Sequence, residues 1–256
     1  MLAVVKNIIK KIIQLEERRT RRIATGVGLN LDISLNKSGA GLLREVFVER
    51  EYANFFPFNE KVIVVDIGAH YGYFSLFAAQ HTHPESIIWA LEPSPTNFHI
   101  LQKNIASNAI SNIIPLNIGI SDSNNTAKLF LSRPENHSIF GSGQEKSVMA
   151  KFRNLETFMR EQDINRIDFL KIDCEGAEYP ILLSTQKAQL ERVDVITLEF
   201  HDLLAKGWKP ADLYQHLVAC GFRIERFQYY PDYGLGNMNF GKLTAINKMS
   251  HYWLNR

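Results

Sequence analysis

The chain has 256 residues, 45% of them hydrophobic, which is enough for one α/β domain with a sizeable core. Its net charge of +2 gives no general case for binding nucleic acid, and no apolar run approaches the length of a membrane span. Two cysteines do not make a disulfide framework, and lysines interrupt the apolar N-terminal stretch, so we expect a cytoplasmic protein without a secretion signal.

Residues 2–22 have the pattern of an amphipathic helix, because Val4, Ile8 and Ile12 recur every four residues. The first 22 residues carry seven Lys or Arg against two Glu, a local charge of +5 that leaves −3 for the rest. Such a helix could pack on the domain or form a homodimer contact, and we favour these over contact with a membrane surface.

Two further elements are expected before the main domain. Residues 30–37 alternate apolar and polar side chains, as a half-buried strand does, and residues 42–56 are expected to be helical up to Pro57. We therefore divide the chain into an N-terminal extension, residues 1–57, and a main domain, residues 58–256. The extension could serve as a lid or as a dimer contact.

Residues 61–77, KVIVVDIGAHYGYFSLF, hold the feature around which the rest of the chain is organised. A β-branched run predicts a strand buried on both faces, which ends at Asp66. Gly68 and Gly72 bracket a tight turn, and a helix follows. A dinucleotide-binding turn would need G-x-G-x-x-G, but His70 occupies the place of the middle glycine. The Asp66 carboxylate would repel a pyrophosphate but could hold the ammonium group of S-adenosylmethionine.

The second strand, residues 87–91, ends at Glu92, twenty positions after Gly72. An acid at this tip suits hydrogen bonding to ribose hydroxyls. The alternative is a plain strand-to-helix connection, which the two well-placed acids make less attractive. Pro93 then begins a loop, and residues 96–107 are expected to be helical.

The third strand, residues 112–116, leads to Ser121 and Asp122. These two residues could line an adenine pocket at the strand tip, although a polar turn explains them equally well. Residues 126–131 predict an extra, antiparallel strand. The polar segment 133–147 is longer than a loop that only connects two elements, which favours a mobile loop that contacts the substrate.

A helix at residues 154–162 precedes the strand 167–172, which opens the string IDFLKIDCEGAE. Lys171 and Asp173 share one face of this strand because side chains alternate. Charged groups at a strand end beside a cofactor crevice are costly unless they contact a ligand or each other. We therefore expect Asp173 and Glu175 to contact ligands, whereas Lys171 could form a structural ion pair.

The fifth strand, residues 193–200, ends in EFHD, which places Glu199 and His201 on one face. His201 could remove a proton from a hydroxyl, with Glu199 contacting the substrate. His201 could instead be a satisfied core or capping histidine, with Glu199 as its partner. Asp173, Glu199 and His201 could together bind a divalent ion, but their spacing matches no specific metal motif, so we assign no metal ligands.

The chain continues with a helix at residues 210–220 and strands at 222–230 and 242–247, separated by an aromatic, glycine-rich loop at 231–241. This loop could cover an acceptor or be an ordinary hairpin loop. Five α/β steps followed by a strand pair predict an α/β fold, with a Rossmann-like doubly wound sheet closed by a C-terminal antiparallel strand pair.

From about residue 45 to 202 the chain resembles the FkbM-type S-adenosylmethionine-dependent methyltransferases. The resemblance lies in VVDIGAHYGYFSL, ALEPSPTNF and LEFH, and most specifically in LKIDCEGAE. It implies a Rossmann-like methyltransferase fold and methylation of a hydroxyl oxygen, often on a sugar, glycolipid or polyketide. By position, Asp66, Gly68 and Glu92 would touch the cofactor, and Asp173 would lie beside the transferred methyl group. His70, where Asn is common, and Glu156, where Asp is usual, depart from the family pattern.

The expected site therefore has three parts. His201 is the first candidate base, with Asp173 orienting the acceptor or acting as base instead, and Glu175 and Glu199 contact the substrate. The expected cofactor-binding residues are Asp66, Gly68, Ala69, His70, Gly72, Glu92, Pro93, Ser121, Asp122 and Asp173. The acceptor is expected to be a small molecule or glycan. A nicotinamide-dependent oxidoreductase and a non-catalytic protein that retains the fold stay open as alternatives.

Overall fold

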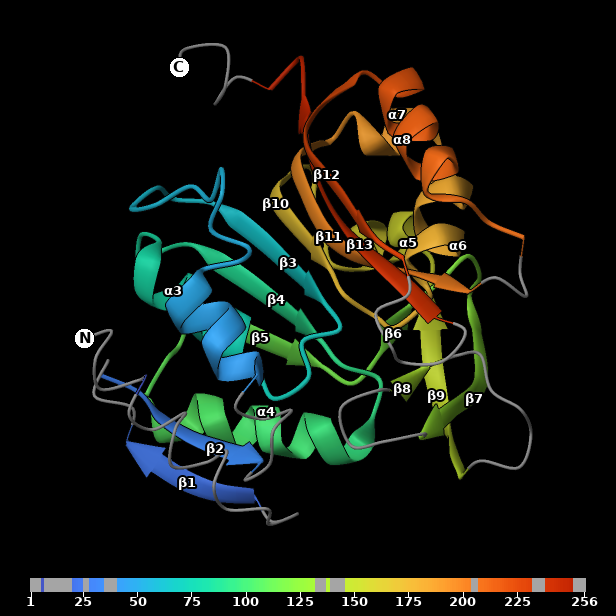
Figure 1. Ribbon diagram of the computed structural model, residues 1–256. Helices are drawn as coiled ribbons and strands as arrows, with labels where there is room; N and C mark the ends of the chain where they lie inside the picture. Colours follow the sequence, from blue (N-terminus) through green and yellow to red (C-terminus); the bar gives the residue numbers. More distant parts are fainter. Residues whose placement is uncertain are drawn as a thin grey trace.

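The computed structural model describes the following residues: 6, 20–24, 28–34, 41–131, 137–138, 146–203, 207–231 and 238–250. Its centre is a seven-stranded sheet with the order β12-β13-β11-β10-β3-β4-β5 (Figure 1). The strands are β3 (Ile63–Ile67), β4 (Ile87–Leu91), β5 (Ile113–Leu116), β10 (Ile167–Ile172), β11 (Val193–Leu203), β12 (Phe222–Tyr230) and β13 (Met238–Asn247). The first five are parallel, and β13 runs antiparallel to its two neighbours. The predicted doubly wound sheet with a C-terminal antiparallel pair is confirmed.

Helices cover both faces of this sheet, and each face has its own apolar core (Figure 1). One face carries α3 (Tyr73–His81) and α4 (Pro95–Ser107); the other carries α5 (Leu155–Glu161), α6 (Glu178–Ser184), α7 (Lys187–Leu190) and α8 (Pro210–Ala219). Val64 and Phe169 belong to the first core, whereas Val65 and Leu170 belong to the second. Alternating side chains thus explain why these strands are apolar throughout.

The strand order reverses between β3 and β10. The chain runs outward from β3 through β4 to β5 and then crosses back to β10, which pairs with the other side of β3. Neighbouring strands on the two sides of this point are followed by loops that diverge, which opens a crevice at their carboxyl ends. The register places Lys171 beside Asp66, so the charged residues of both strands meet at that crevice.

Residues before β3 pack into the same fold. β1 (Thr20–Ala24) and β2 (Asn30–Ser34) form an antiparallel pair. The β2 backbone is hydrogen-bonded to the side chains of Asn104 in α4 and of Asn108, the residue that follows α4. The π-helix η1 (Arg44–Glu49) follows. Tyr52 and Phe56 then enter the first core, where they make edge-on contacts with Phe74. The boundary that we draw at residue 57 stays a prediction.

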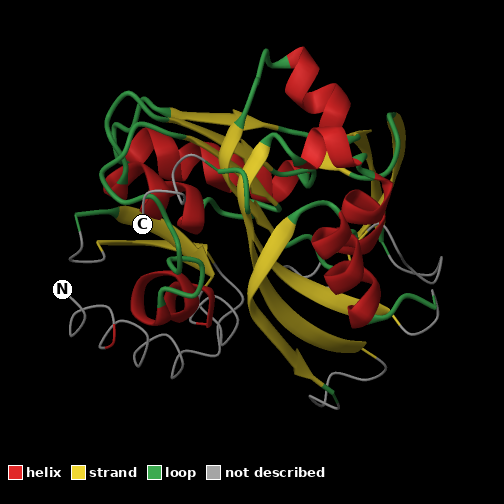
Figure 2. Cartoon of the chain, turned by 90° about the horizontal axis from the view of Figure 1, so that it is seen from above, coloured by secondary structure: helices red, strands yellow, loops and turns green. Residues whose placement is uncertain are grey.

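Between β5 and α5 the chain forms a second, four-stranded sheet with the order β6-β9-β7-β8, whose strands are labelled in Figure 1. The view from above in Figure 2 shows helices on both sides of the strands. The strands of this second sheet are β6 (Gly119–Ile120), β7 (Asn125–Leu131), β8 (His137–Ser138) and β9 (Ser147–Arg153). The predicted extra strand at residues 126–131 is confirmed as β7, and it pairs antiparallel with β8 and β9. β9 and the separate sheet were not predicted from the sequence.

Three expectations about local structure are wrong in part. The helix expected at residues 42–56 ends at Glu49, where Arg50 adopts a left-handed conformation with φ of 51°. Residues 20–22 belong to β1 and not to the predicted N-terminal helix. Most of that helix, and most of the predicted loop at residues 133–147, lies outside the described residues. Residues 238–241 extend β13 rather than the loop before it. Within the described ranges, every helix is too short or too polar to cross a membrane.

The turn after β3 leaves no space for a side chain at Gly68. Its φ is +77°, and a Cβ atom there would stand 1.8 Å from the Asp173 carbonyl oxygen. Gly207 has a similar φ of +74°, but a Cβ atom there would meet nothing within 4 Å. A side chain at either position would strain the backbone, but only a side chain at Gly68 would also clash with a neighbouring atom.

We predict that Gly68→Ala lowers the free energy of unfolding by about 3 kcal/mol or more, because the backbone of β10 must move. Gly207→Ala should cost only the left-handed strain of about 1 kcal/mol. Urea denaturation followed by circular dichroism measures both. Equal losses in the two variants would contradict the close approach between the β3 turn and β10.

Candidate active site

The β3 turn is tied to the tip of β4 by hydrogen bonds. The amides of Gly68 and Ala69 both donate to the Leu91 carbonyl at 3.0 Å. The Glu92 carboxylate accepts from the His70 amide and from the Ser94 amide, each at 2.8 Å. Glu92 thus connects the glycine turn to the start of α4, and burial raises its pKa to about 7 despite these two hydrogen bonds.

A cavity of about 700 Å³, which includes space open to solvent, lies over the ends of β3, β4 and β10. Six predicted site residues line it: Gly68, His70, Glu92, Pro93, Asp173 and Glu175. Its other lining residues are Leu42, Ile67, Asn97, Gly119, Ile120, Leu129, Phe152, Cys174 and Ala177. A smaller cavity of about 350 Å³ is lined by the predicted Ala69 together with Glu45, Tyr52 and Lys171, and it shares Gly68, His70 and Asp173 with the first.

Lys171 lies beneath the turn as a buried cation that joins two strands. Its Nζ atom is 3.2 Å from Oδ1 of Asp66 and 3.6 Å from Oδ2 of Asp173. It also donates a hydrogen bond to the Gly68 carbonyl at 3.2 Å. Burial alone would lower the pKa of Lys171, but the two carboxylates outweigh burial and raise this pKa above its usual value.

Asp66 has no exposed surface and lies outside both cavity linings. Its Oδ2 atom accepts a hydrogen bond from the Ser75 hydroxyl at 2.7 Å, and its Oδ1 atom faces Lys171. The structure therefore gives Asp66 a supporting place under the turn. Gly72 is likewise structural here: it precedes α3 with φ of +81°, and a Cβ atom would meet the Leu101 side chain at 2.3 Å.

Asp173 is held as an ionised carboxylate facing the cavities. Burial acts to raise its pKa, but Lys171, with His201 and the Tyr52 hydroxyl, lowers it below the ordinary value. Tyr52 donates to Oδ2 of Asp173 at 3.0 Å. The nearby Glu45 has a pKa raised to about 7, first by burial and then by the negative charges of Glu199 and Asp173.

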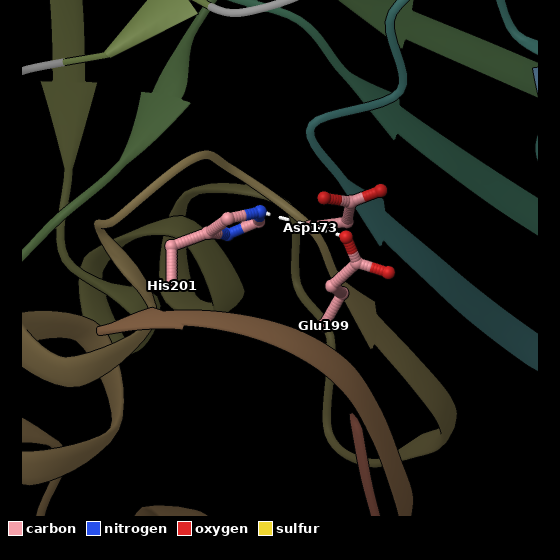
Figure 3. A group of neighbouring side chains, drawn as sticks. All are labelled: Asp173, Glu199 and His201. Atoms are coloured by element: carbon pink, nitrogen blue, oxygen red, sulfur yellow. Dashed lines mark ion pairs between the residues drawn. The ribbon is translucent and has the colours of Figure 1, made fainter. Parts of the chain in front are cut away.

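His201 stands among three carboxylates, those of Glu175, Glu178 and Glu199. Figure 3 shows His201 with Glu199 and the nearby Asp173. The Nδ1 atom of His201 is 3.3 Å from Glu178, and its Nε2 atom is 3.5 Å from both Glu175 and Glu199. Burial would lower the pKa of His201, but these acids outweigh it and raise the pKa well above the ordinary value. A protonated imidazole has no lone pair with which to accept a proton. In this environment Asp173 suits the base role better than His201, and the His201 role stays a prediction.

Two predicted adenine-side residues lie outside both cavity linings. The Ser121 hydroxyl bonds to the backbone of Ser123, and Asp122 is exposed. Gly119 and Ile120, just before them, line the larger cavity instead. The residues from the second sheet, Leu129 and Phe152, were missed because no local pattern connects them to the β3 turn. Tyr52 and Glu178 were missed for the same reason.

We predict that Lys171→Met lowers the free energy of unfolding by about 3–5 kcal/mol, because two carboxylates lose their buried partner. Lys187→Met is the matched control: Lys187 is 59% exposed and pairs with Glu191 at 3.9 Å, so its loss should cost less than about 1 kcal/mol. Urea denaturation at neutral pH measures both. Similar midpoints for the two variants would show that Lys171 does not hold the strand tips together.

The sequence model of the methyltransferase FkbM domain matches residues 66–224 of this chain. Methyltransferase sdnD of Sordaria araneosa is 28% identical over 80% of this chain and 88% of its own length. Methyltransferase 1 of Beauveria bassiana is 26% identical over 68% of this chain and 86% of its own.

Among solved structures, M. capricolum TrmK in complex with S-adenosyl-homocysteine is similar to this chain. The similarity covers 79% of this chain and 68% of TrmK, with 14% sequence identity and a TM-score of 0.49. The matched family segment begins at Asp66 and ends in β12, so it spans the β3 turn, Glu92, Asp173 and His201 and covers more than half of the chain. The chain belongs to the FkbM methyltransferase domain family, whose members use S-adenosylmethionine.

Proposed function

We propose that this S-adenosylmethionine-dependent methyltransferase transfers the methyl group to a hydroxyl oxygen of a small-molecule or glycan acceptor. The observation that carries the proposal is the meeting of Gly68, Glu92 and Asp173 in one cavity at the reversal point of the sheet. Ligands of doubly wound sheets bind in this crevice. Two facts argue against a nicotinamide-dependent oxidoreductase: the turn lacks the G-x-G-x-x-G glycines, and the chain belongs to a methyltransferase family.

The residues at the crevice fit the cofactor. Each Glu92 oxygen accepts one backbone hydrogen bond, which leaves further acceptor capacity for ribose hydroxyls. The carboxylates that line the cavity suit the positive charges of S-adenosylmethionine. Gly119, Ile120 and Phe152 give the cavity an apolar wall, on which an adenine ring could pack.

The bound cofactor supplies an electrophilic methyl group, so the protein needs chiefly to position an acceptor oxygen and to receive its proton. Asp173 is placed for both tasks because it is ionised and lines both cavities. Its lowered pKa makes it a weak base, but the acceptor oxygen becomes strongly acidic as its bond to the methyl group forms, so a weak base is enough. Tyr52 and Lys171 fix the Oδ2 atom of Asp173, which limits how the carboxylate can rotate. The smaller cavity, lined by Tyr52, Tyr71 and Tyr73, offers aromatic surfaces on which a sugar or polyketide could pack.

We predict that Glu92→Ala weakens binding of S-adenosylhomocysteine at least about tenfold, because the ribose loses charge-assisted hydrogen bonds. Ribose hydroxyls bind the ionised carboxylate better, so the wild-type affinity should rise as the pH increases through about 7. Calorimetric titration across this range measures both effects. The exposed Glu156→Ala variant is the control. An unchanged affinity in Glu92→Ala would remove Glu92 from the cofactor site.

We predict that Asp173→Asn lowers kcat about 10²–10⁴-fold, because the amide cannot take the acceptor proton, while the affinity for S-adenosylhomocysteine changes little. Transfer of an isotope-labelled methyl group to a panel of sugars and hydroxylated small molecules provides the assay, and mass spectrometry of the product locates the methyl group. Asp163→Asn, at an exposed position, is the control. Methylation of nitrogen or carbon rather than oxygen would refute the proposed acceptor class.

A further inference from the structure

Three side chains with metal-binding groups converge beside the cavity. Asp173, Glu199 and His201 each offer one ligand atom, and these atoms lie within 4.8 Å of one another (Figure 3). Asp173 follows β10, whereas Glu199 and His201 lie on the adjacent strand β11. Since parallel strands place their carboxyl ends at the same edge, the sheet itself brings the three groups together.

The distances within this cluster leave room for an ion. Nε2 of His201 is 3.5 Å from Oε1 of Glu199 and 3.5 Å from Oε2 of Glu175. Both separations exceed the roughly 2.7–3.2 Å of an ordinary N–H···O hydrogen bond. Two ligands bound at about 2.0–2.1 Å in a tetrahedral zinc site stand about 3.4 Å apart. The spacing therefore resembles neighbouring ligands around a metal more than closed hydrogen bonds.

The other side of the His201 ring has the support that metal-binding histidines usually have. Nδ1 lies 3.3 Å from Glu178, a residue with no exposed surface. The Glu178 carboxylate also accepts from the backbone amides of Cys174 and Gly176 at 3.0 and 2.9 Å. A fixed carboxylate on one ring nitrogen orients the ring and directs the other nitrogen toward a metal. Glu178 thus turns Nε2 toward Glu175 and Glu199.

The neighbouring lysines neutralise only part of the negative charge. Lys242 is 3.4 Å from Oε2 of Glu199, but it is equally close to carboxylate oxygens of Glu45 and Glu51. Lys171 is 3.6 Å from Asp173 and nearer to Asp66. Both lysines contact the cluster from outside, and Oε1 of Glu199 faces His201 rather than Lys242. A divalent cation bound at Nε2 would displace the proton that His201 carries without metal, and it would balance the remaining charge.

We propose that Asp173, Glu199 and His201, with Glu175 as a further carboxylate, bind one divalent transition-metal ion. A ligand set of one imidazole and several carboxylates suits zinc or manganese, whereas magnesium and calcium prefer oxygen ligands alone. Asp173 and Glu175 line the larger cavity, so the ion would lie at the cavity wall with a coordination position open to a ligand. Its use would be to hold the acceptor oxygen, with Asp173 then acting as a ligand of the ion instead of as the base. That use, unlike the binding itself, rests on the proposed function.

The test is metal binding by the full chain after treatment with a chelator. Zn²⁺ is titrated by calorimetry, and bound Mn²⁺ is followed by electron paramagnetic resonance, both without acceptor. We expect one equivalent to bind, and we expect Glu199→Gln to weaken that binding at least about tenfold, because one charged ligand becomes neutral. Glu191→Gln is the matched control, since Glu191 is 53% exposed and pairs with Lys187. Titration with S-adenosylhomocysteine, whose predicted site does not include Glu199, verifies that each variant is folded.

The results separate this inference from the proposed function. The inference fails if the folded wild type binds neither ion, or if Glu199→Gln binds both as tightly as wild type does. If the metal binds as expected but no hydroxyl is methylated, the metal site stands and the proposed acceptor class is lost. If labelled methyl groups reach a hydroxyl in protein that binds no metal, the proposed function stands and the metal site is lost.

Discussion

The buried ammonium group of Lys171 is the constraint on which the site depends. It connects Asp66 under the glycine turn with Asp173 at the end of β10, and it donates to the carbonyl of Gly68. A buried ion pair is weak evidence for stability, because apolar groups of the same shape often serve as well. Its value here is geometric: the cation fixes two carboxylates and one carbonyl relative to each other, on strands that diverge after this point.

The residues before β3 complete this arrangement. The Tyr52 hydroxyl reaches Asp173, while the Tyr52 ring and Phe56 pack on Phe74 in the core. Glu45 joins the same charged network through Tyr52 and Lys242. The described residues from 41 onward therefore contribute side chains to the site itself. This is the region that the sequence offered as a possible lid.

The sequence predicts what is local and periodic. The strand, turn and helix around Gly68, the acid at Glu92 and the string at Asp173 all follow from patterns within a few residues, and the structure brings Gly68, Glu92 and Asp173 to one cavity. The raised pKa of His201 could not be predicted, because it depends on Glu175, Glu178 and Glu199 meeting in space. Asp66 was expected at the ligand; one hydrogen bond from Ser75 of α3 and the ion pair with Lys171 hold its carboxylate beneath the turn, and its contact with the cofactor stays a prediction.

The second sheet has a consequence for how such proteins diversify. A Cβ atom at Gly119 would stand 2.4 Å from the Phe152 ring, and this ring forms a wall of the larger cavity together with Leu129. This wall belongs to an insertion between β5 and α5, whereas the reactive groups belong to the main sheet. Mutations in the insertion can reshape the chamber while the strand tips stay intact, so ligand preference and chemistry can evolve on separate parts of one gene.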